Sequence, residues 1–292
     1  MRNQCQTLRS LLQPGAFSSI AGAYDMVSAR LAGQAGCQVI HVGGFNLSAV
    51  KLGLPDVGLL TLSENTDAVC RIAGSVEAPV IADGDDGYGN HLNVARLIRE
   101  LERGGVAGVH IEDQVFPKRC GHMVGKRIVP VAAMVQKIKA AVDTRIDDDF
   151  VVIARTDAIA VEGFEAAMDR AQAYQEAGAD MLFVEAPRSD HEVAQIPMLI
   201  QAPTLFNWCH GGLSPTPDVA SVKQLGYPMI LFTDVLFAVA KMLSGLYGDI
   251  AAGKGYGDHT VDMMPLGDFN TMIGLEDVNV LDARFAVDSL LK

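Results

Sequence analysis

The sequence predicts a (β/α)8 barrel, and two observations carry that prediction. Eight short runs rich in apolar and β-branched residues alternate with longer amphipathic segments. These runs are too continuously apolar for half-exposed antiparallel strands, and they suit a parallel sheet covered on both faces. Polar residues also gather where the runs end, and in a barrel the carboxyl ends of the strands converge on one face. A doubly wound open sheet is the rival fold, but it would spread the same residues along an edge.

The predicted elements follow one another without a visible break as far as residue 245. Two helical patterns, 93–105 and 163–179, show apolar residues at three-to-four spacing and a glycine after the last turn. Beyond 245 the pattern changes to a linker-like stretch and a further helical region. We therefore expect a catalytic barrel over 1–245 and a helical extension over 246–292. The predicted strands are 18–23, 38–43, 79–84, 106–113, 150–157, 180–187, 203–208 and 228–234.

Composition and charge argue against several classes of function. The 292 residues carry a formal net charge of −12, and no basic stripe suited to nucleic acid is visible. No apolar run approaches the length of a membrane span, and the N-terminus lacks the apolar stretch of a signal peptide. The five cysteines are odd in number and lack zinc-type pairing. We expect a reduced, cytoplasmic enzyme that binds neither nucleic acid nor a membrane.

Three carboxylates follow two neighbouring predicted strands. Asp83 and Asp85 stand two apart in "ADGDDGYGN", and Glu112 ends the next strand. Such hard oxygen ligands suit Mg²⁺, which keeps several waters and takes one or two protein carboxylates. The alternative is an ordinary acidic loop in which Asp86 or Asn90 caps the next helix. Glu112 favours the metal, because three converging carboxylates would otherwise repel one another.

A single cysteine lies in the polar segment "PKRCGHMVGK", 117–126, which is too polar to be core. Its neighbours Lys118, Arg119 and His122 would all favour the thiolate of Cys120, giving an acid–base group near neutral pH. An incidental surface cysteine is the alternative. The "GH" that follows the cysteine and the carboxylates that precede it favour the reactive thiol.

Polar residues also end three of the later strands. Arg155 in "ARTD" could hold a carboxylate bidentately or stabilise an oxyanion, and Glu185 in "FVEA" could form a structural ion pair across the barrel mouth. Asn207 in "FNW" could donate to a substrate carboxylate or satisfy buried backbone. Phe45 would form an apolar wall of the site, or simply core.

Together these motifs resemble one known family. "KRCGH", "GVHIEDQ", "ADGDDGYGN", "ARTDA", "LGLPDVGLLTLSE" and "AGADMLFVEAP" are similar to the isocitrate lyase/phosphoenolpyruvate mutase superfamily. The closest branch holds the methylisocitrate and 2,3-dimethylmalate lyases, with the related oxaloacetate hydrolases. "KRCGH" is the most specific motif, because the phosphonate mutases and the oxaloacetate decarboxylase branch lack it. The resemblance implies a barrel whose last helices swap between paired subunits, a homotetramer, bound Mg²⁺ (Mn²⁺ as the alternative) and a mobile loop that closes over a dicarboxylate substrate.

The resemblance also implies roles for individual residues. Asp83, Asp85 and Glu112 match the metal-site acids, which act partly through waters, and Cys120 matches the catalytic acid/base. The implied catalytic group is Cys120, His122, Arg155 and Glu185. The implied substrate-binding group is Gly43, Gly44, Phe45, Asp83, Lys118, Gly121, Arg155 and Asn207.

The implied reaction is a retro-aldol cleavage of a 2-hydroxydicarboxylate, in which Cys120 protonates the enediolate carbon. His41 stands where the isocitrate and methylisocitrate lyases have a tyrosine, so it is either a base for the hydroxyl proton or a structural residue. Ala238 stands where methylisocitrate lyase carries an arginine for its extra carboxylate. We therefore expect a 2,3-dialkylmalate substrate such as 2,3-dimethylmalate, giving pyruvate and propanoate. Methylisocitrate cleavage, oxaloacetate hydrolysis and a catalytically silent carboxylate sensor are the alternatives.

Overall fold

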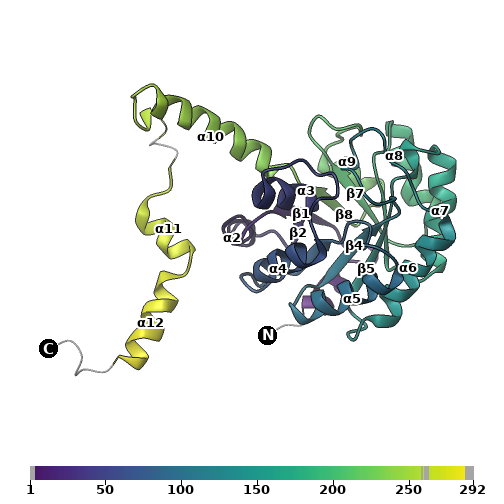
Figure 1. The fold of residues 1–292 in the computed structure, drawn as a ribbon, viewed down its shortest axis with the longest axis horizontal. Helices are drawn as coiled ribbons and strands as arrows, with labels where there is room; N and C mark the ends of the chain where they lie inside the picture. The colour runs from purple at the N-terminus through teal and green to yellow at the C-terminus, as the bar shows by residue number, and fades with distance from the viewer. Residues whose placement is uncertain (1–3, 258, 260–262, 287–292) are drawn as a thin grey trace. The chain divides into compact units, whose positions relative to one another are not determined.

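Eight parallel strands of the computed structural model close into a barrel (Figure 1). The structure describes residues 4–257, 259 and 263–286. The strands pair in sequence order, and β1 pairs with β8 to close the sheet. The (β/α)8 prediction is confirmed, and each strand lies within its predicted range. The strands are β1 (Ser18–Ala23), β2 (Val39–Val42), β3 (Val80–Asp83), β4 (Gly108–Glu112), β5 (Val151–Thr156), β6 (Met181–Val184), β7 (Thr204–Trp208) and β8 (Met229–Phe232).

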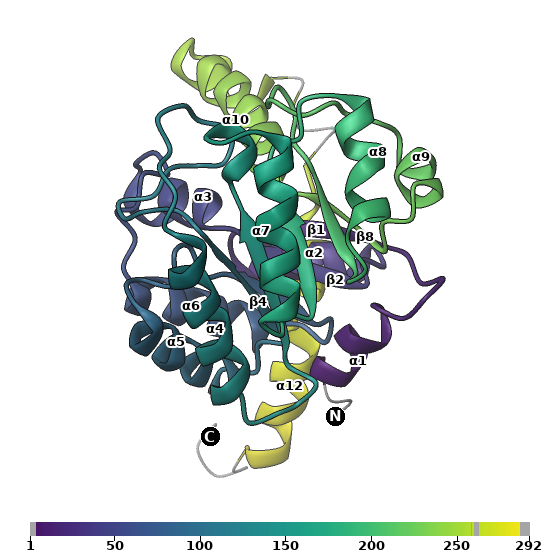
Figure 2. The ribbon, with the colours of Figure 1, turned by 90° about the vertical axis from the view of Figure 1, so that its right-hand side faces the viewer.

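Helices cover the outside of the barrel, and Figure 2 shows α7 in front of the strands. Side-chain caps start several of them: the Thr61 hydroxyl accepts from the Glu64 N–H, and the Asn90 side chain accepts from the Leu92 N–H. Asn90 therefore caps a helix, as the acidic-loop alternative expected. The helices up to residue 224 are α1 (Gln4–Ser10), α2 (Met26–Gln34), α3 (Gly44–Leu47), α4 (Leu62–Ala73), α5 (His91–Arg103), α6 (Val131–Thr144), α7 (Phe164–Glu176), α8 (Asp190–Leu199) and α9 (Val219–Gln224), with a π turn η1 (Ser48–Leu52) and a 3₁₀ turn η2 (Ala158–Ala160).

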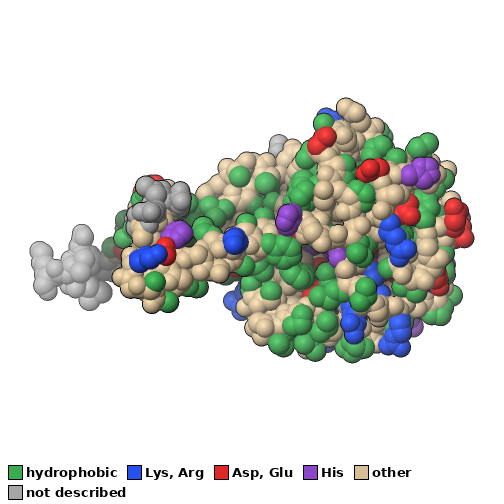
Figure 3. Space-filling view, turned by 90° about the horizontal axis from the view of Figure 1, so that it is seen from above, with side chains coloured by type: hydrophobic (Ala, Val, Ile, Leu, Met, Phe, Trp, Pro, Cys, Tyr) green, Lys and Arg blue, Asp and Glu red, His purple; other side chains and the backbone are tan. Residues whose placement is uncertain are grey.

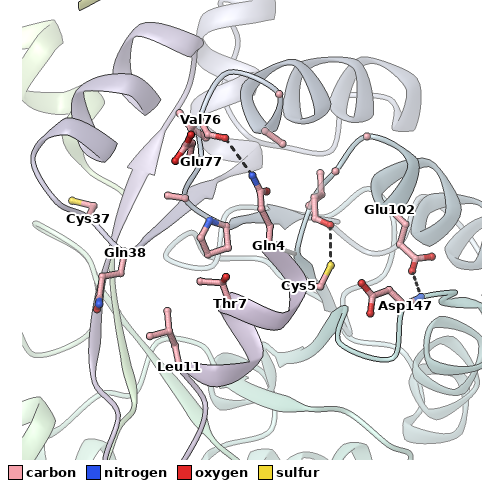
Figure 4. A pocket seen from close by; sticks show the side chains of 17 residues that line it. Gln4, Cys5, Thr7, Leu11, Cys37, Gln38, Val76, Glu77, Glu102 and Asp147 are labelled. Atoms are coloured by element: carbon pink, nitrogen blue, oxygen red, sulfur yellow. Dashed lines mark hydrogen bonds between the residues drawn. The ribbon is translucent and has the colours of Figure 1, made fainter. Parts of the chain in front are cut away.

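Helix α1 covers the amino-terminal end of the barrel and is seen at the lower right of Figure 2. Arg9 donates to the Phe150 carbonyl at 3.1 Å, just before β5, and to the Asp180 carboxylate at 2.9 Å, just before β6. A cavity of about 1050 Å³ lies beside α1, and Gln4 and Thr7 line one side of it (Figure 4). This cavity is at the opposite end of the barrel from the buried ionisable groups described below.

The chain separates into two compact units, one ending at Leu236 and the other beginning at Phe237. The second unit contains most of α10 (Val235–Ala251), α11 (Leu266–Met272) and α12 (Leu275–Phe285). The boundary predicted at residue 245 lies inside α10.

No helix in the described part of the chain is long and apolar enough to span a bilayer. On the barrel face in Figure 3, Lys and Arg side chains lie singly among acidic and apolar ones.

Candidate active site

The barrel brings the predicted polar residues together at one end. Asp83 is the last residue of β3 and Glu112 the last of β4, while Arg155 and Asn207 are next to last in β5 and β7. Glu185 directly follows β6. Glu112 and Arg155 are register partners on adjacent strands. The expected convergence at the carboxyl ends of the strands is therefore present in the structure.

A glycine at the start of α3 lies against the first two carboxylates. The Gly44 N–H donates to Asp83 Oδ2 at 2.8 Å, and the Asp85 N–H donates to Asp83 Oδ1 at 3.0 Å. A Cβ added to Gly44 would lie 2.9 Å from Asp85 Oδ1 and 3.1 Å from Asp83 Oδ2. The missing side chain thus leaves the carboxylates accessible to a ligand. Phe45, the next residue of α3, is half-buried.

Lys118 is held by two of the acids rather than free to bind substrate. Its ammonium lies 2.6 Å from Asp56 Oδ1 and 2.5 Å from Asp85 Oδ1, and all three side chains are buried. Burial raises the pKa of Asp85 to about 7, with Asp83 and Asp56 adding to the rise and Lys118 opposing it. Asp85 also adopts a left-handed backbone conformation with a φ of 47°.

Acid exceeds base in this region. Burial raises the pKa of Glu112 well above its usual value despite the opposing charge of Arg155, and Glu112 Oε1 has no hydrogen-bond partner among the described residues. Burial would also raise the pKa of Asp83, but His110, Lys118 and Arg155 together lower it. The buried carboxyl groups of the site are Asp56, Asp83, Asp85, Glu112, Asp157 and Glu185, and the buried cations beside them are Lys118, Lys126 and Arg155. Asp86 and Asp113 are also buried, and they pair with Lys137 and Arg170.

This excess of acid suits a divalent cation, although a dry three-ligand site is not preformed. In the part of the chain that the structure describes, no three His, Cys, Asp or Glu side chains are grouped closely enough to ligate one ion directly. Mg²⁺ commonly binds through one or two carboxylates and keeps several waters. The orphaned Glu112 oxygen and the neighbouring Asp83 and Asp85 fit such a water-rich site.

Arg155 is anchored by carboxylates on three sides. Its Nε donates to Asp157 Oδ2 at 2.9 Å and lies 3.3 Å from Glu112 Oε2 and 3.9 Å from Glu185 Oε2. The guanidinium also lies over the Phe183 ring, 5.0 Å from its centroid. The ion pair between Arg155 and Glu185, which was the structural alternative for these residues, is present but long. Nη1 makes no hydrogen bond to the described residues, which leaves it available for an anionic ligand.

The cysteine loop is docked on this cluster through His122. His122 Nε2 lies 2.9 Å from Glu185 Oε1, and the Leu213 N–H donates to Nδ1 at 3.0 Å. The accepting Nδ1 assigns the ring proton to Nε2, which donates to Glu185. Asn207 Nδ2 also donates to Glu185 Oε1 at 3.3 Å. His122, Glu185 and Asn207 therefore form one connected group of side chains, in which Glu185 is buried.

The predicted thiolate at Cys120 is wrong. Burial raises the pKa of this thiol to about 11, with Asp56 among the carboxylates that add to the rise. The side chains of the three basic neighbours do not pair with the thiol. Lys118 is paired with acids, Arg119 is exposed, and His122 donates its ring proton to Glu185. Cys120 is therefore a protonated thiol at neutral pH, and its own N–H donates to the Asp56 carbonyl at 3.1 Å.

His41 pairs with a second histidine that the sequence did not single out. Its Nε2 lies 2.8 Å from Nε2 of His110, and the two rings stack with centroids 5.1 Å apart. His110 Nδ1 lies 3.5 Å from Asp83 Oδ1. Burial, and then His110, lower the pKa of His41 to about 3. This favours the structural alternative for His41, because so weak a base is a poor acceptor of a hydroxyl proton. Gly43 lies against the same ring, where an added Cβ would be 3.2 Å from His41 Cε1.

Sequence reasoning gives no role to four buried residues around the site, Asp56, His110, Lys126 and Asp157, although Asp157 stands at a predicted strand end. Each lies within or beside a motif that the sequence already singled out. The usable signal was a charged or polar residue at a strand end, such as Asp157 in "ARTD". Residue type and spacing did not show which acid would pair with which base.

Eight parallel strands with buried acids, an arginine and a thiol at their carboxyl ends define the enzyme class of (β/α)8 barrels. A family model described as phosphoenolpyruvate phosphomutase matches residues 8–245. The chain belongs to this family, within the phosphoenolpyruvate mutase/isocitrate lyase superfamily.

Curated relatives and solved structures cover nearly the whole chain. The 2,3-dimethylmalate lyase of Eubacterium barkeri is 39% identical over 285 residues, covering 97% of this chain and 99% of that protein. The 2-methylisocitrate lyase of Salmonella typhimurium is 42% identical, covering 82% and 84%. A solved oxaloacetate acetylhydrolase bound to 3,3-difluorooxalacetate has a TM-score of 0.92 at 32% identity and covers 97% of each chain. A phosphonopyruvate hydrolase in complex with oxalate and Mg²⁺ has a TM-score of 0.86 at 28% identity, covering 97% and 99%.

Proposed function

We propose that this protein is a Mg²⁺-dependent carbon–carbon lyase that cleaves a 2,3-dialkylmalate, such as 2,3-dimethylmalate, to pyruvate and a carboxylic acid. The observation that carries the proposal is the half-buried thiol of Cys120 in a loop that packs against Arg155 and Glu185, where burial raises its pKa to about 11. A group that must protonate a carbanion needs its proton at working pH, and a thiol with a pKa of about 11 keeps it. The named activity of the Eubacterium barkeri relative supports the choice of substrate.

Asp83, Asp85 and Glu112 are the residues proposed to hold the metal, partly through waters. When bound, Mg²⁺ supplies Lewis-acid stabilisation of the oxygen that becomes the 2-oxo group. The excess of buried carboxyl groups and the orphaned Glu112 Oε1 support this assignment. Mn²⁺ is the alternative ion, because it accepts similar oxygen ligands.

The protein's own residues bind the substrate, accept the hydroxyl proton and donate a proton to carbon. Arg155 and Asn207 hold the carboxylate of the leaving fragment, using the unengaged Nη1 and the amide. The 2-hydroxyl proton passes to a buried carboxylate of the site as the C2–C3 bond breaks, so that the 2-oxo acid forms and the bond's electron pair passes to the C3 fragment as an enediolate. Cys120 then donates its thiol proton to C3, which completes the carboxylic acid. The docked loop excludes water while the enediolate exists.

Oxaloacetate hydrolysis and methylisocitrate cleavage are the alternative reactions. The solved oxaloacetate acetylhydrolase and the Salmonella lyase support them by similarity. The absence of an arginine at Ala238 favours the smaller substrate, since an extra carboxylate without a cation would be costly to bury.

The test is an assay of 2-oxo acid release in the presence of Mg²⁺, with 2,3-dimethylmalate, methylisocitrate, isocitrate and oxaloacetate compared side by side. Pyruvate from 2,3-dimethylmalate, its loss on chelation and its recovery on adding Mg²⁺ or Mn²⁺ are the expected results. Preference for methylisocitrate or oxaloacetate would replace the substrate, and full activity in metal-free protein would overturn the metal assignment.

The assembly and location are also proposals. We expect a homotetramer built from pairs that exchange their last helices, because Val278, Leu281 and Phe285 leave a large apolar stripe exposed along α12. We expect a cytoplasmic location, because all five cysteines are free thiols. No nucleic-acid or membrane partner is proposed.

A further inference from the structure

Lys126 is a buried cation in the same loop as Cys120 that the proposed chemistry does not use. Its side chain is 1% exposed, and Nζ lies 2.9 Å from Asp157 Oδ1, whose side chain is fully buried. The same Nζ donates to the backbone carbonyl of Gly121, between Cys120 and His122. One ammonium therefore connects the centre of the Cys-Gly-His segment to the end of β5.

The carboxylate that receives Lys126 is itself fixed. Asp157 also accepts from Arg155, with Nε at 2.9 Å and Nη2 at 3.2 Å. Behind it, the Asp157 N–H donates to Asp113 Oδ1 at 2.9 Å, and Asp113 accepts from the Tyr174 hydroxyl at 2.8 Å. Lys126 thus holds the loop to a rigid part of the barrel, and to the same acid that orients Arg155.

Stability alone is a poor explanation for this ion pair. Desolvating two charges commonly costs as much as their attraction returns, and apolar replacements of similar volume are often tolerated. An apolar side chain at position 126 could fill the space, but it could not donate to the Gly121 carbonyl and to Asp157 together. The distinctive contribution of lysine here is the position of the loop.

The hydrogen bond from Lys126 to Gly121 fixes a part of the loop that packs closely against the site. A Cβ on Gly121 would lie 2.5 Å from Arg155 Nη2 and 2.6 Å from Glu185 Oε1, so the loop backbone seats directly against the site. A shift of the segment by a fraction of an ångström would move the thiol away from the reacting carbon, and proton transfer is sensitive to such displacement.

We propose that Lys126 is a positioning residue that holds the Cys120–Gly121–His122 segment in its closed seat through Asp157. The proposal rests on the proposed function in taking Cys120 as the proton donor. It assigns Lys126 no contact with substrate. Its effect is on the population of the closed loop and hence on the proton-transfer step.

The first experiment compares Lys126→Met, Lys126→Arg and the exposed-lysine control Lys139→Met. Iodoacetamide alkylation of Cys120 is followed over time by peptide mass spectrometry, with Cys37 on the other side of the barrel as an internal reference. Because population of an open loop exposes the thiol, Lys126→Met is expected to speed Cys120 alkylation by about tenfold or more, with Cys37 unchanged. Lys126→Arg is expected to stay within about threefold of wild type, because it keeps the charge and the donors.

Turnover provides the second readout. On the best substrate from the assay above, Lys126→Met should lower kcat by about tenfold or more with little change in KM, since ground-state contacts are intact. Unchanged alkylation and kcat in Lys126→Met would overturn the proposal, as would a Lys126→Arg enzyme as impaired as Lys126→Met.

The two proposals fail separately. Alkylation requires no turnover. If the protein is inactive on every substrate but Cys120 is labelled faster in Lys126→Met, Lys126 is still a positioning residue and the lyase assignment is lost. If Lys126→Met does not fold, as judged by a lost thermal transition, Lys126→Gln replaces it. If Lys126→Gln shows wild-type Cys120 labelling and kcat, the proposal that the charge of Lys126 positions the loop is overturned.

Discussion

At Cys120, burial leaves a thiol that holds its proton well above neutral pH. Replacing it with serine removes the acidic proton while keeping the volume nearly constant. We expect Cys120→Ser to lower kcat for lyase turnover by about 100-fold or more, the usual contribution of a positioned acid. Steady-state kinetics measures this effect.

Cys37→Ser is the matched control for that substitution. Cys37 is half-buried and lines the cavity beside α1, at the far end of the barrel from Cys120. Its kcat should equal that of wild type. Near-normal kcat in Cys120→Ser would remove the thiol from the reaction.

The pair formed by His41 and His110 makes a pH-dependent contribution to stability. The pKa of His41 is lowered to about 3 in the folded protein, whereas an unfolded histidine titrates near 6.5. Below about pH 6.5 the unfolded chain binds a proton that the folded chain does not, so stability falls as pH falls.

Chemical denaturation at two pH values measures this contribution. From about pH 7.5 to about pH 5.5, wild type should lose roughly 1 kcal/mol more unfolding free energy than His41→Asn. Equal pH dependence in the two proteins would show that His41 titrates normally.

The residues of the site were easier to predict than their states. Strand-end position identified Asp83, Glu112 and Arg155 from the sequence, because parallel strands in a barrel deliver their ends to one place. The thiolate of Cys120 was predicted wrongly, because a basic neighbour in sequence need not be a charge partner in space. Lys118 forms an ion pair with Asp56, which lies 62 positions earlier in the chain, so spacing in the sequence could not predict that the two side chains meet.

At the scale of elements, the loop between β4 and α6 depends on a glycine that touches the site. An added methyl at Gly121 would clash with Arg155 and Glu185. Gly121→Ala should therefore lower kcat by about 100-fold through displaced loop closure, with a thermal midpoint close to wild type.

The control is Gly33→Ala, in the exposed part of α2 where an added Cβ meets nothing within 4 Å. It should keep full activity and gain up to about 1 kcal/mol, because alanine is the better helix former. An active Gly121→Ala enzyme would show that the loop does not need its observed seat.

The strands were predictable as elements because each is a buried, continuously apolar run. Their ends were less so: the predicted 106–113 and 180–187 shrink to Gly108–Glu112 and Met181–Val184. The predicted residues that lie outside the observed strands include Asp113 and Glu185. Their side chains make contacts with the site and the loops. The first helix after β8, α10, begins at Val235, within the range predicted as barrel.

At the scale of the whole molecule, α12 exposes an apolar stripe. Val278, Leu281 and Phe285 share one face at helical spacing and are 61%, 57% and 68% exposed. Such a stripe is expected to be covered by another copy of the chain. Light scattering should therefore give a mass of about four times 31.1 kDa.

Leu281→Lys should shift that mass to a smaller species by placing a charge in the stripe. Asn279→Lys, on a different face of the same helix, is the matched control and should keep the assembly. A wild-type monomer would contradict the tetramer, and an unchanged mass in Leu281→Lys would exclude this face from the interface.

The link between α1 and the barrel also has a consequence for synthesis. Arg9 leaves the ribosome well before its carboxylate partner Asp180, which lies 171 positions later in the chain. The contact between α1 and Asp180 cannot form until five of the eight strands have been translated. During that interval the apolar face of α1 remains accessible to chaperones. The helix therefore covers the amino-terminal end of the barrel late in synthesis.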